Sequence, residues 1–152
     1  MRINFYLIVI SSLILSGCMS VPQRVFYQMN ERGRIKYKTM DLLVWENSLK
    51  QDENVSDHIV LTGDYCSYHL VQIRKEQEPH IHRFHDVAIF LESGEGIMYI
   101  GKESVRIKSG STVFVEHGTP YHFVNTGASP AEEFVIYSPP YDGTDNVRVE
   151  QK

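Results

Sequence analysis

Short runs of β-branched and aromatic residues, separated by glycine, fill most of the chain after residue 55. Glycine stands between these runs where a hairpin or a tight corner needs its conformational freedom. Such runs are typical of strands, and eight are predicted, at 58–62, 65–74, 87–91, 97–100, 103–107, 112–115, 121–125 and 132–137. Many short strands of even spacing with almost no helix predict an all-β fold, which is a sandwich, a barrel or a jelly roll.

One short helix is predicted before the strands. Leu42, Trp45 and Leu49 recur at helical spacing, and Thr39 is suited to cap the first turn. Trp45 is expected to anchor this helix in the core. Residues 39–152 are therefore interpreted as one domain, because the full length of 152 residues suits a single core.

The first 17 residues have the layout of a bacterial secretory signal. One positive residue, Arg2, precedes an apolar run that is too short to span a bilayer, and small residues follow it. The sequence Leu-Ser-Gly-Cys at 15–18 resembles the lipobox of bacterial lipoproteins. This resemblance implies cleavage after residue 17, lipidation of Cys18, a tether over 18–38 and a lipid anchor in the cell envelope. Met19 after the cysteine, rather than aspartate, favours the outer membrane over the inner one.

Composition and charge limit the function classes. A content of 42% hydrophobic and 22% charged residues excludes disordered and polytopic membrane proteins. The net charge of −4, without a long basic run, argues against a nucleic-acid partner.

Histidines gather in the middle of the chain. His80 and His82 alternate by two, so in a strand both imidazoles project from one face and can reach the same ion. His85 and Asp86 follow directly and offer a third donor. Imidazoles with one carboxylate suit a divalent transition metal such as Fe, Mn, Zn, Ni or Cu.

Two segments carrying these residues resemble the two motifs of the cupin superfamily, whose members are small β-barrels. The first motif, a histidine pair followed by glutamate and glycine, is similar to PHIHRFHDVAIFLESGEG at 79–96. The second, which runs glycine, proline, glycine, histidine and asparagine, is similar to GSTVFVEHGTPYHFVNTG at 110–127. The resemblance implies a cupin-type jelly-roll barrel with a metal site or a ligand pocket inside.

The chain departs from these motifs at two ligand positions. Val87 stands at the glutamate position, and Asp86 lies one residue before it. Tyr121 stands at the ligand-histidine position, and His122 lies one residue after it. A bulge near Pro120 would turn His122 inward, because a slip of one residue moves a side chain to the other face.

The resemblance together with such slips predicts a metal set of His80, His82, Asp86 and His122, with His85 and Tyr121 as alternative ligands. The function expected is a membrane-anchored cupin that binds a divalent metal and a small polar molecule, with metal-dependent enzymatic activity left open. The alternative is a metal-free lipoprotein of the envelope that binds a small molecule or acts as a scaffold. Homodimer formation is also left open.

Overall fold

The computed structural model describes residues 24–150, and these divide into two compact units after Met40. Among these residues, no helix is long and apolar enough to cross a membrane. The predicted signal at 1–17 and the lipidation site Cys18 lie outside the described residues.

The first unit contains a β-hairpin that the sequence analysis did not predict. Strand β1 (Val25–Met29) pairs antiparallel with β2 (Ile35–Thr39), and Tyr27 lies opposite Tyr37. The turn between the strands contains Gly33, whose positive φ of 68° suits glycine. The segment expected as a tether therefore includes a formed two-stranded ribbon.

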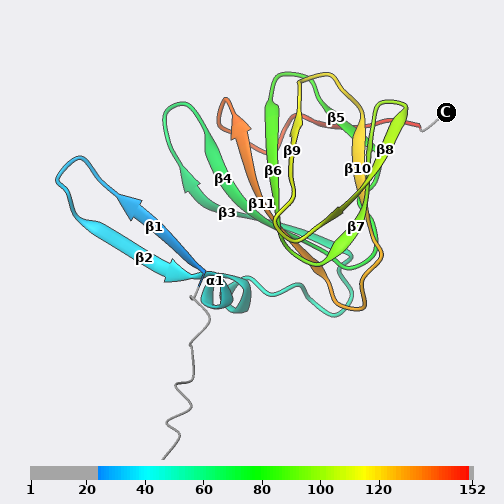
Figure 1. The fold of residues 1–152 in the computed structure, drawn as a ribbon. Coiled ribbons are helices and arrows are strands. Elements are labelled where there is room, and N and C mark those ends of the chain that lie inside the picture. The colour runs from blue at the N-terminus through cyan, green and yellow to red at the C-terminus, as the bar shows by residue number, and fades with distance from the viewer. Residues whose placement is uncertain (1–23, 151–152) are drawn as a thin grey trace, which may run out of the picture. The chain divides into compact units, whose positions relative to one another are not determined.

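The second unit is a barrel of two five-stranded antiparallel sheets, which confirms the all-β jelly-roll prediction (Figure 1). One sheet has the order β3-β4-β11-β6-β9 and the other the order β12-β5-β10-β7-β8. The strands of the first sheet are β3 (Val55–Thr62), β4 (Ser67–Ile73), β6 (Asp86–Ser93), β9 (Thr112–Val115) and β11 (Ala131–Ser138). Those of the second are β5 (His80–His82), β7 (Glu95–Ile100), β8 (Glu103–Lys108), β10 (Tyr121–Asn125) and β12 (Asn146–Arg148). All eight predicted strands are present, together with the strand expected at the histidine pair.

The core fills the space between the two sheets. On β11 every second residue from Ala131 to Tyr137 is buried, as expected for a strand with one face inward. On β10, Tyr121 and Phe123 belong to the same apolar cluster. Gly96 on β7 permits this packing, because a Cβ there would lie 2.3 Å from the Phe123 ring. The side chains that alternate with these residues along each strand point away from this core cluster.

The predicted helix is present but shorter, and its buried face is different. Helix α1 (Met40–Glu46) buries Met40 and Leu43. Trp45, expected as the core anchor, is 74% exposed. The helix ends before Leu49, because the Asn47 side chain donates a hydrogen bond to the Leu43 carbonyl oxygen and caps the last turn.

Candidate metal centre

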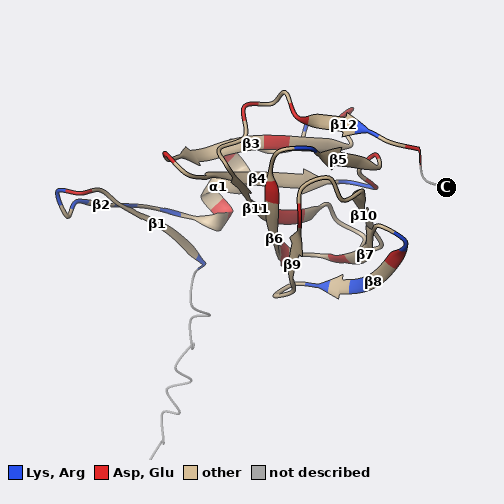
Figure 2. Cartoon of the chain, turned by 90° about the horizontal axis from the view of Figure 1, so that it is seen from above, with Lys and Arg blue, Asp and Glu red and all other residues tan. Residues whose placement is uncertain are grey.

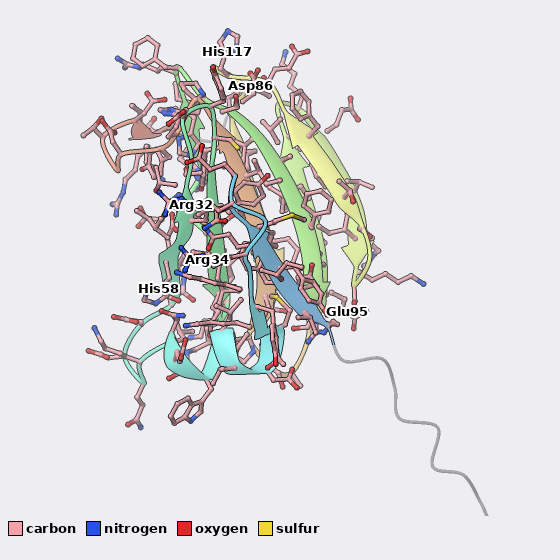
Figure 3. All side chains as sticks on the ribbon, turned by 90° about the vertical axis from the view of Figure 1, so that its left-hand side faces the viewer. Arg32, Arg34, His58, Asp86, Glu95 and His117 are labelled. Atoms are coloured by element: carbon pink, nitrogen blue, oxygen red, sulfur yellow. The ribbon has the colours of Figure 1, made fainter. Side chains whose placement is uncertain are left out.

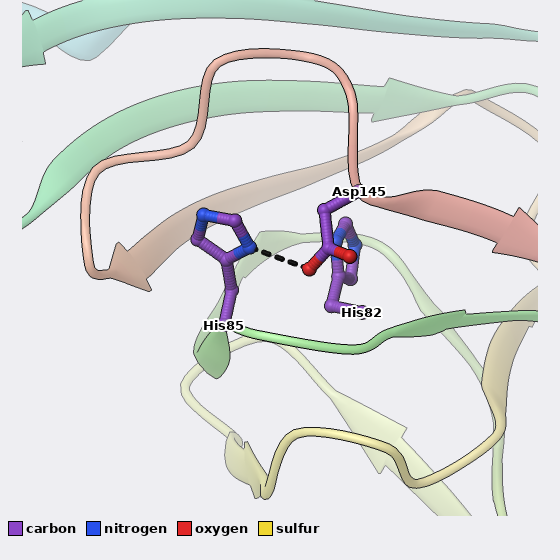
Figure 4. Close-up of side chains that lie close together, drawn as sticks. All are labelled: His82, His85 and Asp145. Carbon is purple, nitrogen blue, oxygen red and sulfur yellow. Dashed lines mark hydrogen bonds and ion pairs between the residues drawn. The ribbon is translucent and has the colours of Figure 1, made fainter.

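Three buried side chains from two distant segments converge inside the barrel. His82 ends β5, His85 lies in the loop to β6, and Asp145 precedes β12. Each offers one donor atom, and these atoms all lie within 4.8 Å of one another (Figure 4). Two imidazoles and one carboxylate form a donor set that binds Fe, Mn, Zn and related divalent metals.

Hydrogen bonds hold the carboxylate of Asp145 in place. Its Oδ2 accepts the His85 Nδ1–H at 2.7 Å and the backbone N–H of Phe84 at 2.8 Å. Burial acts to raise the pKa of Asp145, but these hydrogen bonds outweigh it and hold the pKa below its usual value. The donor group thus includes a charged carboxylate at neutral pH.

Of the three donors, His82 has the fewest hydrogen-bond partners. Within the part of the chain that the structure describes, neither of its buried ring nitrogens has a hydrogen-bond partner. Burial, reinforced by the nearby His80, lowers the pKa of His82 to about 4. Buried polar atoms normally have partners, so a neutral imidazole with two unsatisfied nitrogens fits a bound ligand or metal.

Aromatic rings enclose the donor group. The ring centroid of His82 lies 5.1 Å from that of Tyr137 and 5.0 Å from that of Tyr141. Tyr141 also packs against His85, at 5.4 Å. These rings exclude water from the donors, which strengthens electrostatic interactions inside the group.

A cavity of about 430 Å³ opens beside the donor group, and both sheets contribute to it. His80 and Tyr137 line it, whereas none of the three donors does. The rings of both lining residues also pack against His82, so the cavity lies next to the donor group. Most of the other lining side chains are polar or charged, among them Asp57, Gln77, Asn146 and Arg148. The cavity therefore suits a small polar molecule.

A hydrogen-bonded chain links this cavity to the segment after β11. Asp57 Oδ1 accepts the His69 Nδ1–H at 2.6 Å, and the Ser67 hydroxyl lies 2.9 Å from His69 Nε2. The Ser67 oxygen accepts the backbone N–H of Tyr141 at 3.0 Å. When Nδ1 of His69 carries the ring proton, it donates to Asp57 and Nε2 accepts the Ser67 hydroxyl proton. Each of these polar groups then has a partner. The chain thereby holds the backbone of Tyr141, whose ring packs edge-on against that of His82.

Comparisons with known proteins agree with this architecture. The family model described as "Cupin domain" matches residues 68–137. An uncharacterised protein of Aquifex aeolicus (strain VF5) is 36% identical over 84 residues, which are 55% of this chain and 69% of that protein.

This chain is a cupin. Its fold is similar to that of a Klebsiella pneumoniae protein with a double-stranded β-helix domain, with a TM-score of 0.61, 18% identity and coverage of 71% of this chain and 95% of the other. Streptomyces Pac13, a nucleoside dehydratase, gives a TM-score of 0.57 and 16% identity over 70% of this cupin and 89% of Pac13.

The structure places the two predicted histidines of β5 in the cupin's interior. Both are buried, with ring centroids 5.3 Å apart. His80 donates its Nδ1–H to the Glu78 carbonyl oxygen at 2.7 Å, and burial lowers its pKa. His82 belongs to the donor group, whereas His80 lies beside it.

The structure does not bring His122 to the donor group. Strand β10 pairs with β7 in unbroken register from Tyr121 to Asn125, so the expected bulge is absent. His122 stacks on Tyr99, with centroids 4.5 Å apart, and both residues line a separate cavity of about 340 Å³. Tyr121 takes the inward position instead, with its ring 4.4 Å from that of His80. A ligand set with His122 would need the register of β10 to change.

Asp86 also lies away from the donor group. Its Oδ1 accepts both the backbone N–H and the Nδ1–H of His117, at 2.9 Å and 2.8 Å. Figure 3 shows the two side chains together at one end of the barrel. His85, an alternative ligand in the sequence analysis, occupies the place in the donor group that the prediction gave to Asp86.

A second buried group also has no hydrogen-bond partner in the described part of the chain. Glu133 on β11 is fully buried, opposite Val71 and Leu91 on the neighbouring strands. Neither of its carboxylate oxygens has a hydrogen-bond partner among the described residues. Burial raises the pKa of Glu133 to about 8, so a large fraction of it is protonated at neutral pH.

Several residues of the site were not predicted from the sequence: Asp145, Glu133 and the chain of Asp57, His69 and Ser67. One signal was present for Glu133, because it alternates with Ala131, Val135 and Tyr137 on an inward strand face. Asp145 has no such signal, since it follows a loop and lies 60 residues from His85.

Proposed function

We propose that this cupin binds one divalent transition-metal ion between His82, His85 and Asp145. The observation that carries the proposal is the convergence of three buried donors, one of which has two unsatisfied ring nitrogens. A neutral imidazole and an ionised carboxylate are the forms that bind metal. The backbone N–H of Phe84 donates a hydrogen bond to Asp145. Such a bond orients a carboxylate that binds a metal.

The polar cavity beside the donors is proposed to bind a small polar molecule. A metal held by His82, His85 and Asp145 would supply Lewis acidity to such a molecule. The cupin's own residues would orient it: Arg148, which forms an ion pair with Glu78, offers a cation, and Asp57 offers an acceptor. The Tyr137 ring lines the cavity and packs against His82, so it would limit which part of the molecule reaches the donors.

Elemental analysis of the purified protein tests the metal proposal. After reconstitution with Fe(II), Mn(II) or Zn(II) and gel filtration, about one ion per chain is expected, because one such donor group is found within residues 24–150. Thermal shift with a panel of small polar molecules then tests the cavity, since a ligand stabilises the fold according to its occupancy. Absence of metal under all three conditions would overturn the metal proposal.

Metal-free binding is the second candidate function. It is favoured by Val87 and Tyr121, which take the inward places of two family ligands and are both in the apolar core. Pac13 is a structural neighbour whose variants were solved with uridine, so a polar nucleoside-like molecule belongs in the ligand panel. Ligand stabilisation that persists in a chelating buffer would support this candidate.

For the N-terminal segment we propose cleavage before Cys18, acylation of that cysteine and attachment to a membrane of the bacterial envelope. The lipobox at 15–18 and the short apolar run before it support this proposal. A single acyl chain binds a membrane only reversibly, so stable anchoring needs more than one chain or a second attraction.

A further inference from the structure

The β1–β2 hairpin has one apolar face. Its register places Tyr27 opposite Tyr37 and Met29 opposite Ile35. Because side chains alternate across a strand, these four residues project from the same face. All four are more than half exposed, and the two tyrosine rings pack together at 6.0 Å. Four large exposed side chains on one small ribbon indicate a binding surface.

The same hairpin concentrates positive charge. Residues 24–39 contain five of the chain's 15 lysines and arginines and only one of its 19 acidic residues. Arg32 and Arg34 flank Gly33 in the turn, whereas Lys36 in β2 projects from the face opposite to the apolar one. Figure 2 shows basic residues at the turn and along this strand. The rest of the chain is acidic, so the charge of the hairpin is local.

We propose that the β1–β2 hairpin docks on the surface of an anionic phospholipid bilayer. Tyrosine is suited to the membrane interface, because its ring is apolar and its hydroxyl remains hydrated. Arginine and lysine are attracted to anionic headgroups. The outer edges of a two-stranded ribbon carry unpaired backbone groups, which cannot enter the hydrocarbon region. The hairpin therefore lies at headgroup depth, with Tyr27, Met29, Ile35 and Tyr37 toward the lipid.

The position of the hairpin in the chain supports the same partner. Seven residue steps separate Cys18 from Val25, where β1 begins. Fully extended, they span about 25 Å, so an acylated Cys18 would keep the hairpin at the bilayer surface. This step rests on the acylation proposed above, whereas the apolar face and the charge do not. The hairpin would then be the second attraction that supplements the acyl anchor.

Vesicle binding tests the proposal without the acyl anchor, so that the two proposals can fail separately. The chain from residue 18 with Cys18→Ser is mixed with vesicles of phosphatidylcholine, with or without phosphatidylglycerol, and sedimented. Binding is expected only with phosphatidylglycerol, and it should fall with salt, which screens charges beyond about 10 Å at 0.1 M. Tyr27→Ser with Tyr37→Ser, and Arg32→Gln with Arg34→Gln, should each weaken binding about tenfold or more.

Matched changes on the barrel provide the controls. Tyr65→Ser with Phe114→Ser removes two exposed aromatic rings, and Arg106→Gln with Lys108→Gln removes two exposed charges. Both pairs should bind vesicles as the parent does. All variants should keep the parent melting temperature, because the barrel core contains no hairpin residue. No binding to phosphatidylglycerol, or equal binding by hairpin and control variants, would overturn the proposal. Light scattering would then show whether the tyrosine face joins two copies instead.

Discussion

His82 combines two properties that rarely occur together in a stable core, complete burial and two unsatisfied ring nitrogens. His82→Ala is expected to lower metal affinity by more than about tenfold, which is the smallest effect typical of losing even an outer partner of a metal ligand. The bound metal is measured by elemental analysis after equilibrium dialysis.

His122→Phe is the matched control for this change. It also removes a buried histidine of the barrel, but a phenyl ring retains the stack on Tyr99. Because His122 lies outside the donor group, the variant should keep the parent metal content. Loss of metal in His122→Phe together with retention in His82→Ala would contradict the site.

Glu133 makes stability depend on pH. Its pKa is about 8 in the fold and near 4.5 when unfolded, so the folded protein binds more protons between these values. The contribution of Glu133 to stability is therefore full below about pH 4.5 and is lost as pH rises toward and through 8, by roughly 4–5 kcal/mol at complete ionisation. Glu133→Gln removes the ionisation and should remove this decline, as measured by urea unfolding between pH 5 and 9.

Glu95→Gln serves as the control for the pH series. Glu95 is exposed, at the opposite end of the barrel from Asp86 (Figure 3). It is expected to leave the pH profile unchanged. A profile of Glu133→Gln that parallels the parent would show that Glu133 does not cause the decline.

At the scale of elements, Ser67 connects β4 to the segment that carries the site. Its hydroxyl bonds both His69 and the backbone of Tyr141, four residues before Asp145. Ser67→Ala leaves the buried His69 Nε2 and the part-buried N–H of Tyr141 without this partner, which costs about 1–3 kcal/mol. Metal affinity should fall as well, because the segment that holds Asp145 loosens. Urea unfolding and metal titration measure the two effects.

Ser109→Ala is the corresponding control, because the Ser109 hydroxyl donates to the Glu92 carbonyl oxygen at an exposed turn. It should change stability by less than Ser67→Ala and leave metal affinity unaltered. Equal metal affinity in Ser67→Ala and the parent would limit the role of Ser67 to stability.

The strands of the barrel could be predicted because alternation and glycine spacing are local signals. The β1–β2 hairpin was missed although Ile35, Tyr37 and Thr39 alternate with lysines, because the basic residues made the segment resemble a solvated tether. The helix was predicted, but the prediction of its buried face was wrong. The helical spacing of apolar residues does not by itself show which of them face the core.

The site was predicted in part for a similar reason. His80 and His82 share a strand face, which the sequence shows directly. Asp57 and His69 meet across two strands as diagonal neighbours, since Asp57 lies opposite Val71, and no local pattern reveals that register. Asp145 is brought to the site by a loop, whose path depends on tertiary contacts.

At the scale of the whole molecule, the proposed anchor predicts where the protein resides. Cys18→Ser should leave the chain unprocessed or release it from membranes, because the proposed acyl chains would be attached to Cys18. Intact-mass measurement and membrane fractionation test this. Cys66→Ser is the control, since Cys66 is a free, half-buried cysteine of the barrel and should not affect either readout.

The donors come from two places that are 60 residues apart in sequence, with six barrel strands between them. A bound ion would therefore act as a reversible cross-link that closes a long loop and clamps β12, a three-residue edge strand, beside β5. Chelation should speed amide hydrogen exchange in β12 while β4 and β11, in the middle of the other sheet, keep their protection. Equal exchange in β12 with and without metal would contradict the cross-link. Loss of the ion would then first cause fraying at one edge of the barrel, before the interior strands open.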